Sequence, residues 1–518
     1  MKIQNPVLRG FHPDPSLVRA GDGYYIATST FEWFPGVCIF YSDNLADWEL
    51  VSHGLTDDSL VDMTGIDSAC GIWAPNLTYC DGTFYLMYTI VYTNRSRFKD
   101  TWNYLTTAKD VRGPWSKPVF LNCSGFDPSL FHDTDGKKYL VNMTMDYRPS
   151  ENRFSGIDIQ EFDEKTGTLI GEPRRVYKGS KRGFTEGPNV MKHDDWYYLV
   201  CAEGGTEFGH CSVMLRSRSI WGPYEEDPNN PVISSAGKDC LLQRAGHMQV
   251  VEGKDGRFYM AHLCSRPIDG FSILGRETAI QNVEWSKEGW LKLSANDTAA
   301  PEEYFDAPVA EQKPRKKLYR YDFSEGEISQ DFMTLRKSFV SNGISVQNGK
   351  LYIEGGCSVM SKYHQGLLAR AQESFCCDFS AKMCFIPRHL NHLAGLVVYY
   401  NYDNLYHLRI TKDTEGRKAE VCAIVNKEMT CSRPVYLKGQ SDELWLTARI
   451  REREVTFSIR YPGEEEEIAV GEALDMRNIS DEHIEGNGFT GSMLGVNCVD
   501  VQGDGVFAEF TEIVYREY

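Results

Sequence analysis

The segment CDGTFYLMYT, residues 80–89, occurs in five versions along the first half of the chain. Each version has an Asp-Gly-type turn followed by aromatic and β-branched residues, which is typical of a hairpin that leads into a buried strand. The other four are GDGYYIATST (21–30), TDGKKYLVNM (134–143), HDDWYYLVCA (193–202) and KDGRFYMAHL (254–263). Five β-rich repeats with a period of about 54 to 61 residues predict a five-bladed β-propeller. A solenoid is the alternative, but solenoid periods are shorter and mostly helical.

A second, shorter segment precedes each hairpin by about nine residues. The five versions are HPDPSLV (12–18), IWAPNLTY (72–79), FDPSLFH (126–132), TEGPNVMK (185–192) and AGHMQVV (245–251). We expect the same position in these segments to be occupied by Asp14, Ala74, Asp127, Glu186 and, in the last, Gly246 beside His247. Equivalent positions in a propeller point toward one place near its axis. Three carboxylates that meet there would repel one another, so their gathering indicates chemistry.

Two kinds of chemistry suit such a group of carboxylates. Paired carboxylates hydrolyse glycosidic bonds, one as general acid and the other as base or nucleophile. Carboxylates also bind hard cations, which is the main rival interpretation. The flanking residues are aromatic side chains and prolines rather than further oxygen donors, as at Phe11, Trp73, Phe126 and Phe184. Aromatic walls around a few charged groups favour a sugar site.

The composition excludes several classes of partner. The chain has 518 residues, a formal net charge of −18 and 42% hydrophobic residues, which predicts a soluble protein of two or three domains. The negative charge argues against nucleic acid, an anionic membrane or a polyanionic substrate, and favours a small neutral ligand. The sequence has no signal-like apolar segment at its amino terminus and no run of 18 apolar residues. Fifteen cysteines without a CxxC pair suit free thiols in the cytoplasm.

The chain divides into two β-rich parts. Residues 1–297 form the expected propeller, and residues 298–317 are polar and rich in Ala and Pro, which predicts a linker. Alternating patterns return from 318 to 518, as in GLVVYYNYDNLYHLRI (395–410). We expect a jelly-roll β-sandwich of the concanavalin type there.

The chain resembles glycoside hydrolase family 43, and within it the β-xylosidases that carry a C-terminal β-sandwich. The motifs that carry the resemblance are HPDPS (12–16), GIWAPN (71–76), GFDPSLF (125–131), TEGPN (185–189) and LGRETAIQ (274–281). By this resemblance the protein inverts the anomeric configuration over a five-bladed propeller. Asp14 would be the general base and Glu186 the general acid, while Asp127 would orient the acid and tune its pKa. A charge on Asp127 would raise the pKa of Glu186 in the direction that a general acid needs.

Five further residues are candidates for substrate binding: the resemblance assigns Arg276, Phe489 and His247 to the site, while Phe31 and Trp73 lie beside the repeat motifs. Arg276 would bind sugar hydroxyls and keep a carboxylate ionised, or it could be a core ion-pair partner. Phe31 and Trp73 would form pocket walls, or they could be ordinary blade packing. Phe489, framed by glycines in the second domain, would reach into the pocket and close one side. His247 would lie beneath the pocket, or it could be a satisfied core histidine.

The predicted activity is an inverting exo-glycosidase that releases xylose from the non-reducing ends of β-1,4-linked xylo-oligosaccharides. The resemblance implies a homo-oligomer that needs no cofactor, and it allows a calcium ion held through water near His247. Met248 and Gln249 stand where the family usually has a small or acidic residue, which weakens that metal assignment. The alternatives are an α-L-arabinofuranosidase, a bifunctional xylosidase/arabinofuranosidase, or a non-catalytic carbohydrate-binding propeller.

Overall fold

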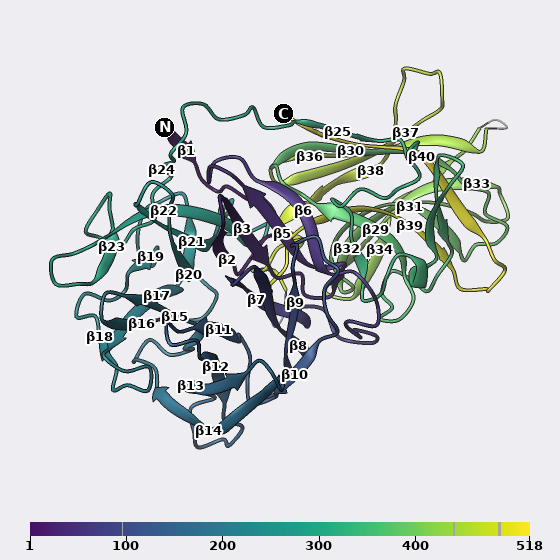
Figure 1. Ribbon diagram of the computed structural model, residues 1–518. Coiled ribbons are helices and arrows are strands. Elements are labelled where there is room, and N and C mark those ends of the chain that lie inside the picture. The colour runs from purple at the N-terminus through teal and green to yellow at the C-terminus, as the bar shows by residue number, and fades with distance from the viewer. Residues whose placement is uncertain (96, 439–440, 485–487) are drawn as a thin grey trace.

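Each of the five sequence repeats folds into one antiparallel sheet, and the five sheets surround a common axis in the computed structural model (Figure 1). The structure describes residues 1–95, 97–438, 441–484 and 488–518. The predicted all-β fold, a five-bladed propeller followed by a concanavalin-like sandwich, is confirmed. In the described part of the chain no helix is long and apolar enough to span a membrane.

The strands of every blade follow one another in chain order. The first blade contains β2 (Ser16–Ala20), β3 (Gly23–Thr28), β5 (Gly36–Ser42) and β6 (Glu49–Leu55). The second contains β7 (Gly71–Cys80), β8 (Thr83–Arg95), β9 (Phe98–Ala108) and β10 (Val119–Asn122). The third contains β11 (Ser129–His132), β12 (Lys138–Met145), β13 (Phe154–Asp163) and β14 (Thr168–Tyr177).

The last two blades complete the ring. The fourth contains β15 (Glu186–His193), β16 (Trp196–Glu203), β17 (Cys211–Ser217) and β18 (Glu225–Glu226), with β19 (Ile233–Ser234) also on β17. The fifth contains β20 (Gln243–Glu252), β21 (Phe258–Ser265), β22 (Glu277–Trp285) and β23 (Leu291–Leu293). The Asp-Gly turns join the first two strands of a blade. At the turn between β7 and β8, both Asp81 (φ 47°) and Gly82 (φ 73°) are left-handed, as a tight two-residue hairpin requires.

The amino-terminal segment closes the ring against the fifth blade. Leu8 forms a β-bridge with Thr278 of β22, and the side chain of Asn5 exchanges hydrogen bonds with the backbone of Ile280. Next to it, β1 (Lys2–Gln4) pairs with β24 (Tyr304–Asp306). The range 298–317, interpreted from the sequence as a linker, thus contributes a short strand to the propeller side of the molecule.

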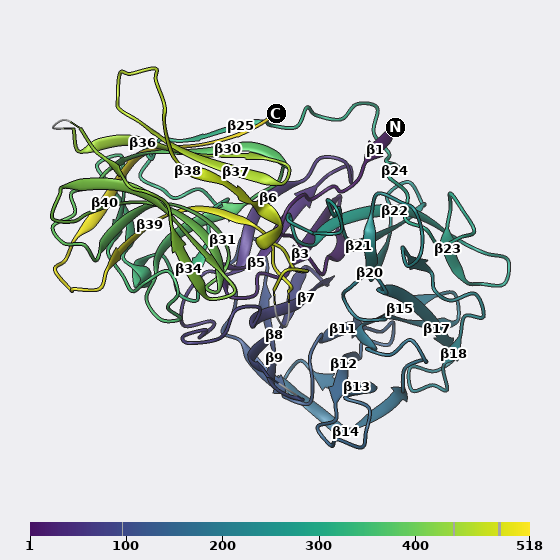
Figure 2. The same cartoon turned by 180° about the vertical axis from the view of Figure 1, so that it is seen from behind.

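The second domain is a sandwich of two antiparallel sheets (Figure 2). One sheet has the order β27 (Ile344–Gln347), β28 (Lys350–Glu354), β40 (Phe507–Glu517), β30 (Cys376–Cys384), β36 (Glu443–Arg451), β37 (Glu454–Arg460) and β38 (Ile468–Asp475), with β25 (Leu318–Tyr321) on β40. The other has the order β29 (Gly366–Ala371), β39 (Met493–Asp500), β31 (His392–Asn401), β32 (Asn404–Lys412), β33 (Arg417–Val425) and β34 (Glu428–Cys431), with β35 (Val435–Tyr436) on β33. Alternate side chains of both sheets, among them Phe379, Leu396 and Phe510, fill one core.

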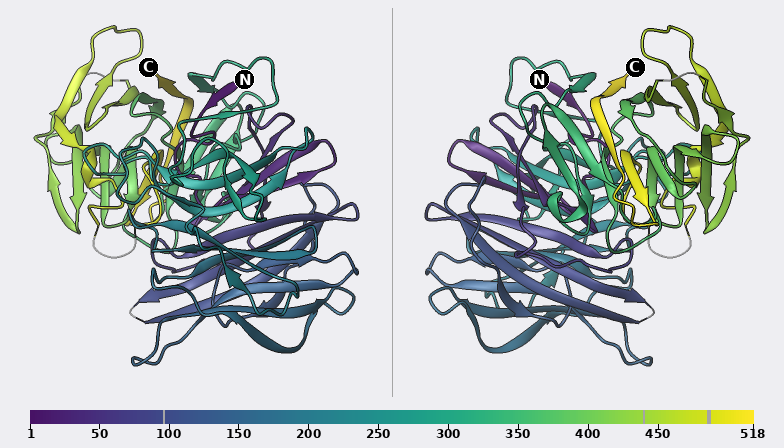
Figure 3. Two further views of the ribbon diagram at one scale, coloured as in Figure 1. Left: turned by 90° about the vertical axis from the view of Figure 1, so that its left-hand side faces the viewer. Right: turned by 90° about the vertical axis from the view of Figure 1, so that its right-hand side faces the viewer.

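The sandwich packs against the first blade, so the two domains lie side by side (Figure 3). Strand β26 (Thr334–Leu335) pairs with β4 (Trp33–Phe34) across the interface. The buried Arg336 follows β26, and its Nε donates a hydrogen bond to the carbonyl of Ile66, 2.9 Å away. This backbone pairing fixes how the sandwich meets the propeller, and therefore which of its loops reaches the propeller axis.

Candidate active site

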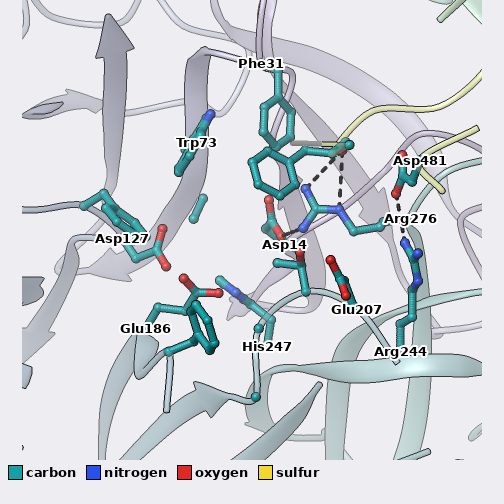
Figure 4. Close-up of a pocket in the computed structure, with 18 of the residues that line it drawn as sticks. Asp14, Phe31, Trp73, Asp127, Glu186, Glu207, Arg244, His247, Arg276 and Asp481 are labelled. Atoms are coloured by element: carbon teal, nitrogen blue, oxygen red, sulfur yellow. Dashed lines mark hydrogen bonds and ion pairs between the residues drawn. The ribbon is translucent and has the colours of Figure 1, made fainter. Parts of the chain in front are cut away.

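A cavity of about 510 Å³ lies where the first strands of the blades converge, beneath a loop of the sandwich (Figure 4). All eight residues predicted from the sequence line it: Asp14, Phe31, Trp73, Asp127, Glu186, His247, Arg276 and Phe489. Each blade contributes at least one of these side chains, and Phe489 comes from the sandwich. Residues separated by hundreds of positions in the sequence therefore share one cavity.

The segment that precedes the hairpin turn of each blade has one residue with a left-handed backbone, which lies shortly before the first strand or within it. This conformation occurs at Asp14 (φ 54°), Ala74 (φ 27°), Asp127 (φ 53°), Gly187 (φ 56°) and His247 (φ 53°). Such φ values are uncommon outside glycine, and aspartate and histidine tolerate them better than most residues. The sequence prediction that Glu186 and Gly246 occupy the position of Asp14 is therefore wrong by one residue.

The β-sheet pairings show the same offset. Glu186 pairs with Ala202 at the place where Trp73 pairs with Thr89 and Gly246 pairs with Leu263. After each of these residues the strand bulges, and regular pairing resumes three residues later. A bulge redirects the side chain that precedes it. Glu186 thus enters the cavity from the residue before the left-handed position, whereas Asp14 and Asp127 occupy that position themselves.

Asp14 is buried and held by two donors. Ser29 Oγ donates to one carboxylate oxygen at 2.6 Å, and Arg276 Nη1 donates to the other at 2.8 Å. Burial alone would raise the pKa of Asp14. The positive charge of Arg276, with smaller contributions from His247 and the Ser29 hydrogen bond, outweighs burial and lowers the pKa below its ordinary value. Asp14 is therefore an ionised carboxylate at neutral pH.

The pKa of Glu186 shifts in the opposite direction to that of Asp14. Burial raises its pKa to about 7, and the negative charge of Asp14 adds to the rise, while the positive charge of Lys99 opposes it. The sequence predicts Asp127 as the source of this rise, but burial, Lys99 and Asp14 make the largest contributions. Glu186 can therefore hold a proton at neutral pH beside an ionised Asp14.

Asp127 is tied to the backbone beside Glu186. Its Oδ2 accepts a hydrogen bond from the amide of Gly187 at 2.9 Å. Burial, together with the negative charges of Glu186 and Asp14, raises the pKa of Asp127 well above its ordinary value. The contact fixes the peptide that follows Glu186, and so restrains where the Glu186 carboxyl can lie.

Lys99, which the sequence analysis missed, is the cation beside Glu186. It lies on β9 and is 6% exposed, with Nζ 4.5 Å from the ring centroid of Trp73 and 4.7 Å from that of Phe126. Burial lowers its pKa to about 8, and the charge of Glu186 partly offsets that effect. The alternation of β9 is inverted, since Phe98 faces solvent while Lys99 is buried. The sign of this in the sequence was the set of polar residues at alternate positions of β9, Lys99, Thr101 and Asn103, which are the buried ones.

Three aromatic rings form one wall of the cavity. The ring centroid of Phe31 lies 5.9 Å from those of both Trp73 and Phe489, and Trp73 meets Phe489 edge to face at 5.4 Å. The carbonyl of Phe489 accepts a hydrogen bond from Arg276 Nη2 at 3.1 Å. The guanidinium of Arg276 thus joins the carboxylate of Asp14 to the sandwich loop.

Further side chains anchor this loop to the fifth blade. Arg244 pairs with Asp481 at 2.9 Å and with Glu482, while the amide and hydroxyl of Ser272 donate to Glu482 at 2.7 and 2.9 Å. Tyr400 of the sandwich donates to Asp481 from the other side. Arg244 and Ser272 were also missed, because their partners lie more than 200 residues away in sequence.

His247 lies against the fourth blade at Gly187. A Cβ atom at Gly187 would come within 2.9 Å of the imidazole ring, so only glycine fits there. Burial lowers the pKa of His247, so the ring is neutral at pH 7. In the described part of the chain, no group of three His, Cys, Asp or Glu side chains could hold a metal ion. The donors around His247 therefore do not fit a metal bound directly by side chains.

The cavity combines an ionised carboxylate, a protonated carboxyl group and an aromatic wall. Two carboxyl groups whose environments separate their pKa values can act as base and acid in one reaction. Aromatic faces suit the apolar faces of a sugar ring. The arrangement fits hydrolysis of a glycosidic bond.

Comparison with known proteins agrees with this chemistry. Residues 3–291 match the model of glycosyl hydrolases family 43, and residues 320–516 match the beta xylosidase C-terminal Concanavalin A-like domain. The chain is 40% identical to the xylosidase/arabinosidase 43B of Humicola insolens, over 99% of this chain and 98% of that protein. It is 38% identical to a beta-xylosidase of Bacillus subtilis (strain 168), over 100% of both chains.

A solved structure is similar along the whole chain. The xylan beta-1,4-xylosidase from Bacillus halodurans C-125 superposes with a TM-score of 0.96 at 42% identity, covering 99% of this chain and 100% of that one. The chain therefore belongs to glycosyl hydrolases family 43 and is a glycoside hydrolase.

Proposed function

We propose that the protein is an inverting exo-β-xylosidase, which releases xylose from the non-reducing ends of β-1,4-linked xylo-oligosaccharides. The observation that carries the proposal is the pairing of an ionised Asp14 with a Glu186 whose pKa is about 7, in one aromatic-walled cavity. The names of the matched relatives support xylose as the terminal sugar.

In this reaction Asp14 accepts a proton from water, and the water oxygen forms a bond to the anomeric carbon. Glu186 donates its proton to the glycosidic oxygen as the bond between that oxygen and the anomeric carbon breaks. Arg276 keeps Asp14 ionised, and the hydrogen bond from Gly187 to Asp127 holds Glu186 in place. The products are one xylose and an oligosaccharide shorter by one unit.

The direct test compares nitrophenyl β-D-xyloside with nitrophenyl α-L-arabinofuranoside and follows the first-formed sugar by proton NMR. We expect the xyloside to be preferred and α-xylose to appear before mutarotation, because inversion converts the β-anomer to the α-anomer. A preference for the arabinoside would support the second candidate, an arabinofuranosidase, which the name of the Humicola relative favours. Initial release of β-xylose would contradict the inverting mechanism.

We also propose that the reaction needs no metal cofactor. Arg276 already supplies the positive charge beside Asp14, at 2.8 Å. Treatment with EDTA should therefore leave kcat and KM unchanged within error. Loss of activity that calcium restores would contradict this proposal and assign His247 to a hydrated cation.

Phe489 closes the cavity from the sandwich and should confine the enzyme to terminal sugars. Phe489→Ala removes a ring that contacts both Phe31 and Trp73, so we expect KM for xylobiose to rise by roughly fivefold, which corresponds to the loss of one aromatic contact of about 1 kcal/mol. The far-UV circular dichroism spectrum should not change. Unaltered kinetics in a folded variant would leave Phe489 with a packing role only.

The oligomeric state and the cellular location follow from the resemblance and from the cysteine content. We propose a homo-oligomer that acts in the cytoplasm on imported oligosaccharides. The fifteen cysteines, all free thiols in the described structure, support a reducing compartment. Light scattering at several protein concentrations would measure the oligomeric state.

A further inference from the structure

Two cysteines lie directly opposite each other in the sandwich, and neither lines the active-site cavity. Cys422 of β33 pairs with Cys431 of β34 in the antiparallel register. The other cysteines of the described strands pair with residues of other types. Cys376 and Cys377 are adjacent on β30 and therefore point to opposite faces of the sheet.

The hairpin geometry places the two sulfur atoms on the same face at close range. The turn residues Asn426 (φ 49°) and Lys427 (φ 73°) are both left-handed, which identifies a two-residue hairpin loop. In such a hairpin the pair that flanks the loop is hydrogen-bonded, and the pairs alternate from there. Cys422 and Cys431 are then a non-hydrogen-bonded pair. The hydrogen bond from the Ser432 amide to the Val421 carbonyl, 2.8 Å long, agrees with this alternation.

This type of pair suits a disulfide. The Cα atoms of a non-hydrogen-bonded pair are about 4.5 Å apart and their side chains converge. Disulfides join residues whose Cα atoms are about 4.4–6.8 Å apart. The backbone therefore needs no large movement for a bond to form between these two residues.

The two thiols differ in accessibility and surroundings. Cys431 is exposed, and Arg409 Nη2 donates a hydrogen bond to its sulfur at 3.5 Å, while Glu420 holds the same guanidinium at 2.7 Å. Cys422 is 1% exposed, and burial raises its pKa to about 12. Reactive cysteines are accessible and lie beside a positive charge. Cys431 is thus the thiol that meets a reagent first, with Cys422 directly behind it.

We propose that Cys422 and Cys431 form a redox modification site, which low-molecular-weight disulfides such as oxidised glutathione convert to an internal disulfide. The Cys431 thiolate attacks one sulfur of the reagent, forms a mixed disulfide and releases one glutathione thiolate. Cys422 then attacks the Cys431 sulfur and releases the second. Two protein thiols are oxidised, the reagent is reduced to two thiols, and the two protein protons end on the released thiolates.

The test uses the full-length protein, oxidised glutathione, a quench with N-ethylmaleimide, and non-reducing peptide mapping by mass spectrometry. We expect a linked peptide pair containing Cys422 and Cys431, in roughly tenfold excess over glutathione retained on Cys431, because the second thiol is held at high effective concentration. Cys123 is the matched control, since it is exposed and has no cysteine opposite it in the described pairings, so it should retain glutathione.

Variants separate the two steps. In Cys422→Ser, glutathione should remain on Cys431, and in Cys431→Ser, residue 422 should stay unmodified. Hydrolysis of nitrophenyl xyloside, or of the arabinoside if that is the substrate, serves only to show that each variant is folded. A stable glutathione adduct on Cys431 of the unaltered protein, with Cys422 still free, would overturn the proposal.

Discussion

Replacing Glu186 by Gln should nearly abolish hydrolysis of xylobiose, while an aryl xyloside with an acidic phenol keeps much of its rate. A natural leaving group is a poor one and needs a proton, and this assistance is worth about 10²–10⁴-fold. An acidic phenol leaves without it. The Glu186→Gln side chain keeps the shape of the site but cannot act as an acid. Steady-state kinetics on both substrates measure the difference.

The pH dependence of hydrolysis provides a control for the Glu186→Gln variant. Because the pKa of Glu186 is raised to about 7, its protonated form is lost as the pH rises through that value. The unaltered enzyme should therefore lose activity on xylobiose above about pH 7. The variant should show no such alkaline limb on the activated substrate. Equal slowing of both substrates would require a different acid.

Asp14→Asn should reduce hydrolysis of xylobiose and of the aryl xyloside together, by about 10²–10⁴-fold, because both need an activated water. Asparagine tolerates the left-handed backbone found at Asp14, so the fold should persist. Ser29→Ala is the matched control, since it removes one hydrogen bond to the carboxylate and leaves the ion pair with Arg276. We expect it to lose far less activity.

A substrate-dependent effect of Asp14→Asn would contradict its role as base. If only the natural substrate were slowed, Asp14 would serve the leaving group instead. A thermal unfolding scan of each variant distinguishes loss of chemistry from loss of structure.

The fold could be predicted because its signals are local. The first two strands of each blade and the turn between them are adjacent in sequence, as at Asp81 and Gly82, and five such units repeat. The same regularity identified Asp14, Asp127 and Glu186 as a group. It failed at the position of Glu186, because a bulge of one residue leaves no mark in the pattern of apolar residues.

The missing parts of the site depend on contacts between distant segments. Lys99 looks like an ordinary strand lysine until its strand is placed with the polar face inward. Arg244 could not be connected to Asp481 from sequence, because 237 residues separate them and only the docked sandwich brings them together. Phe489 was predicted through family resemblance rather than from its own surroundings.

Arg276 donates hydrogen bonds to both Asp14 and the carbonyl of Phe489, which has a consequence for the newly made chain. Asp14 is synthesised early, and Phe489 is synthesised about 475 residues later. At about 5–20 residues per second, roughly 25–95 s pass between the two. Once Glu186 has been made, the nascent chain contains all three carboxylates but still lacks Phe489, the third ring of the aromatic wall. The closed form of the cavity therefore arises only near the end of synthesis, when the loop that carries Phe489 meets the propeller.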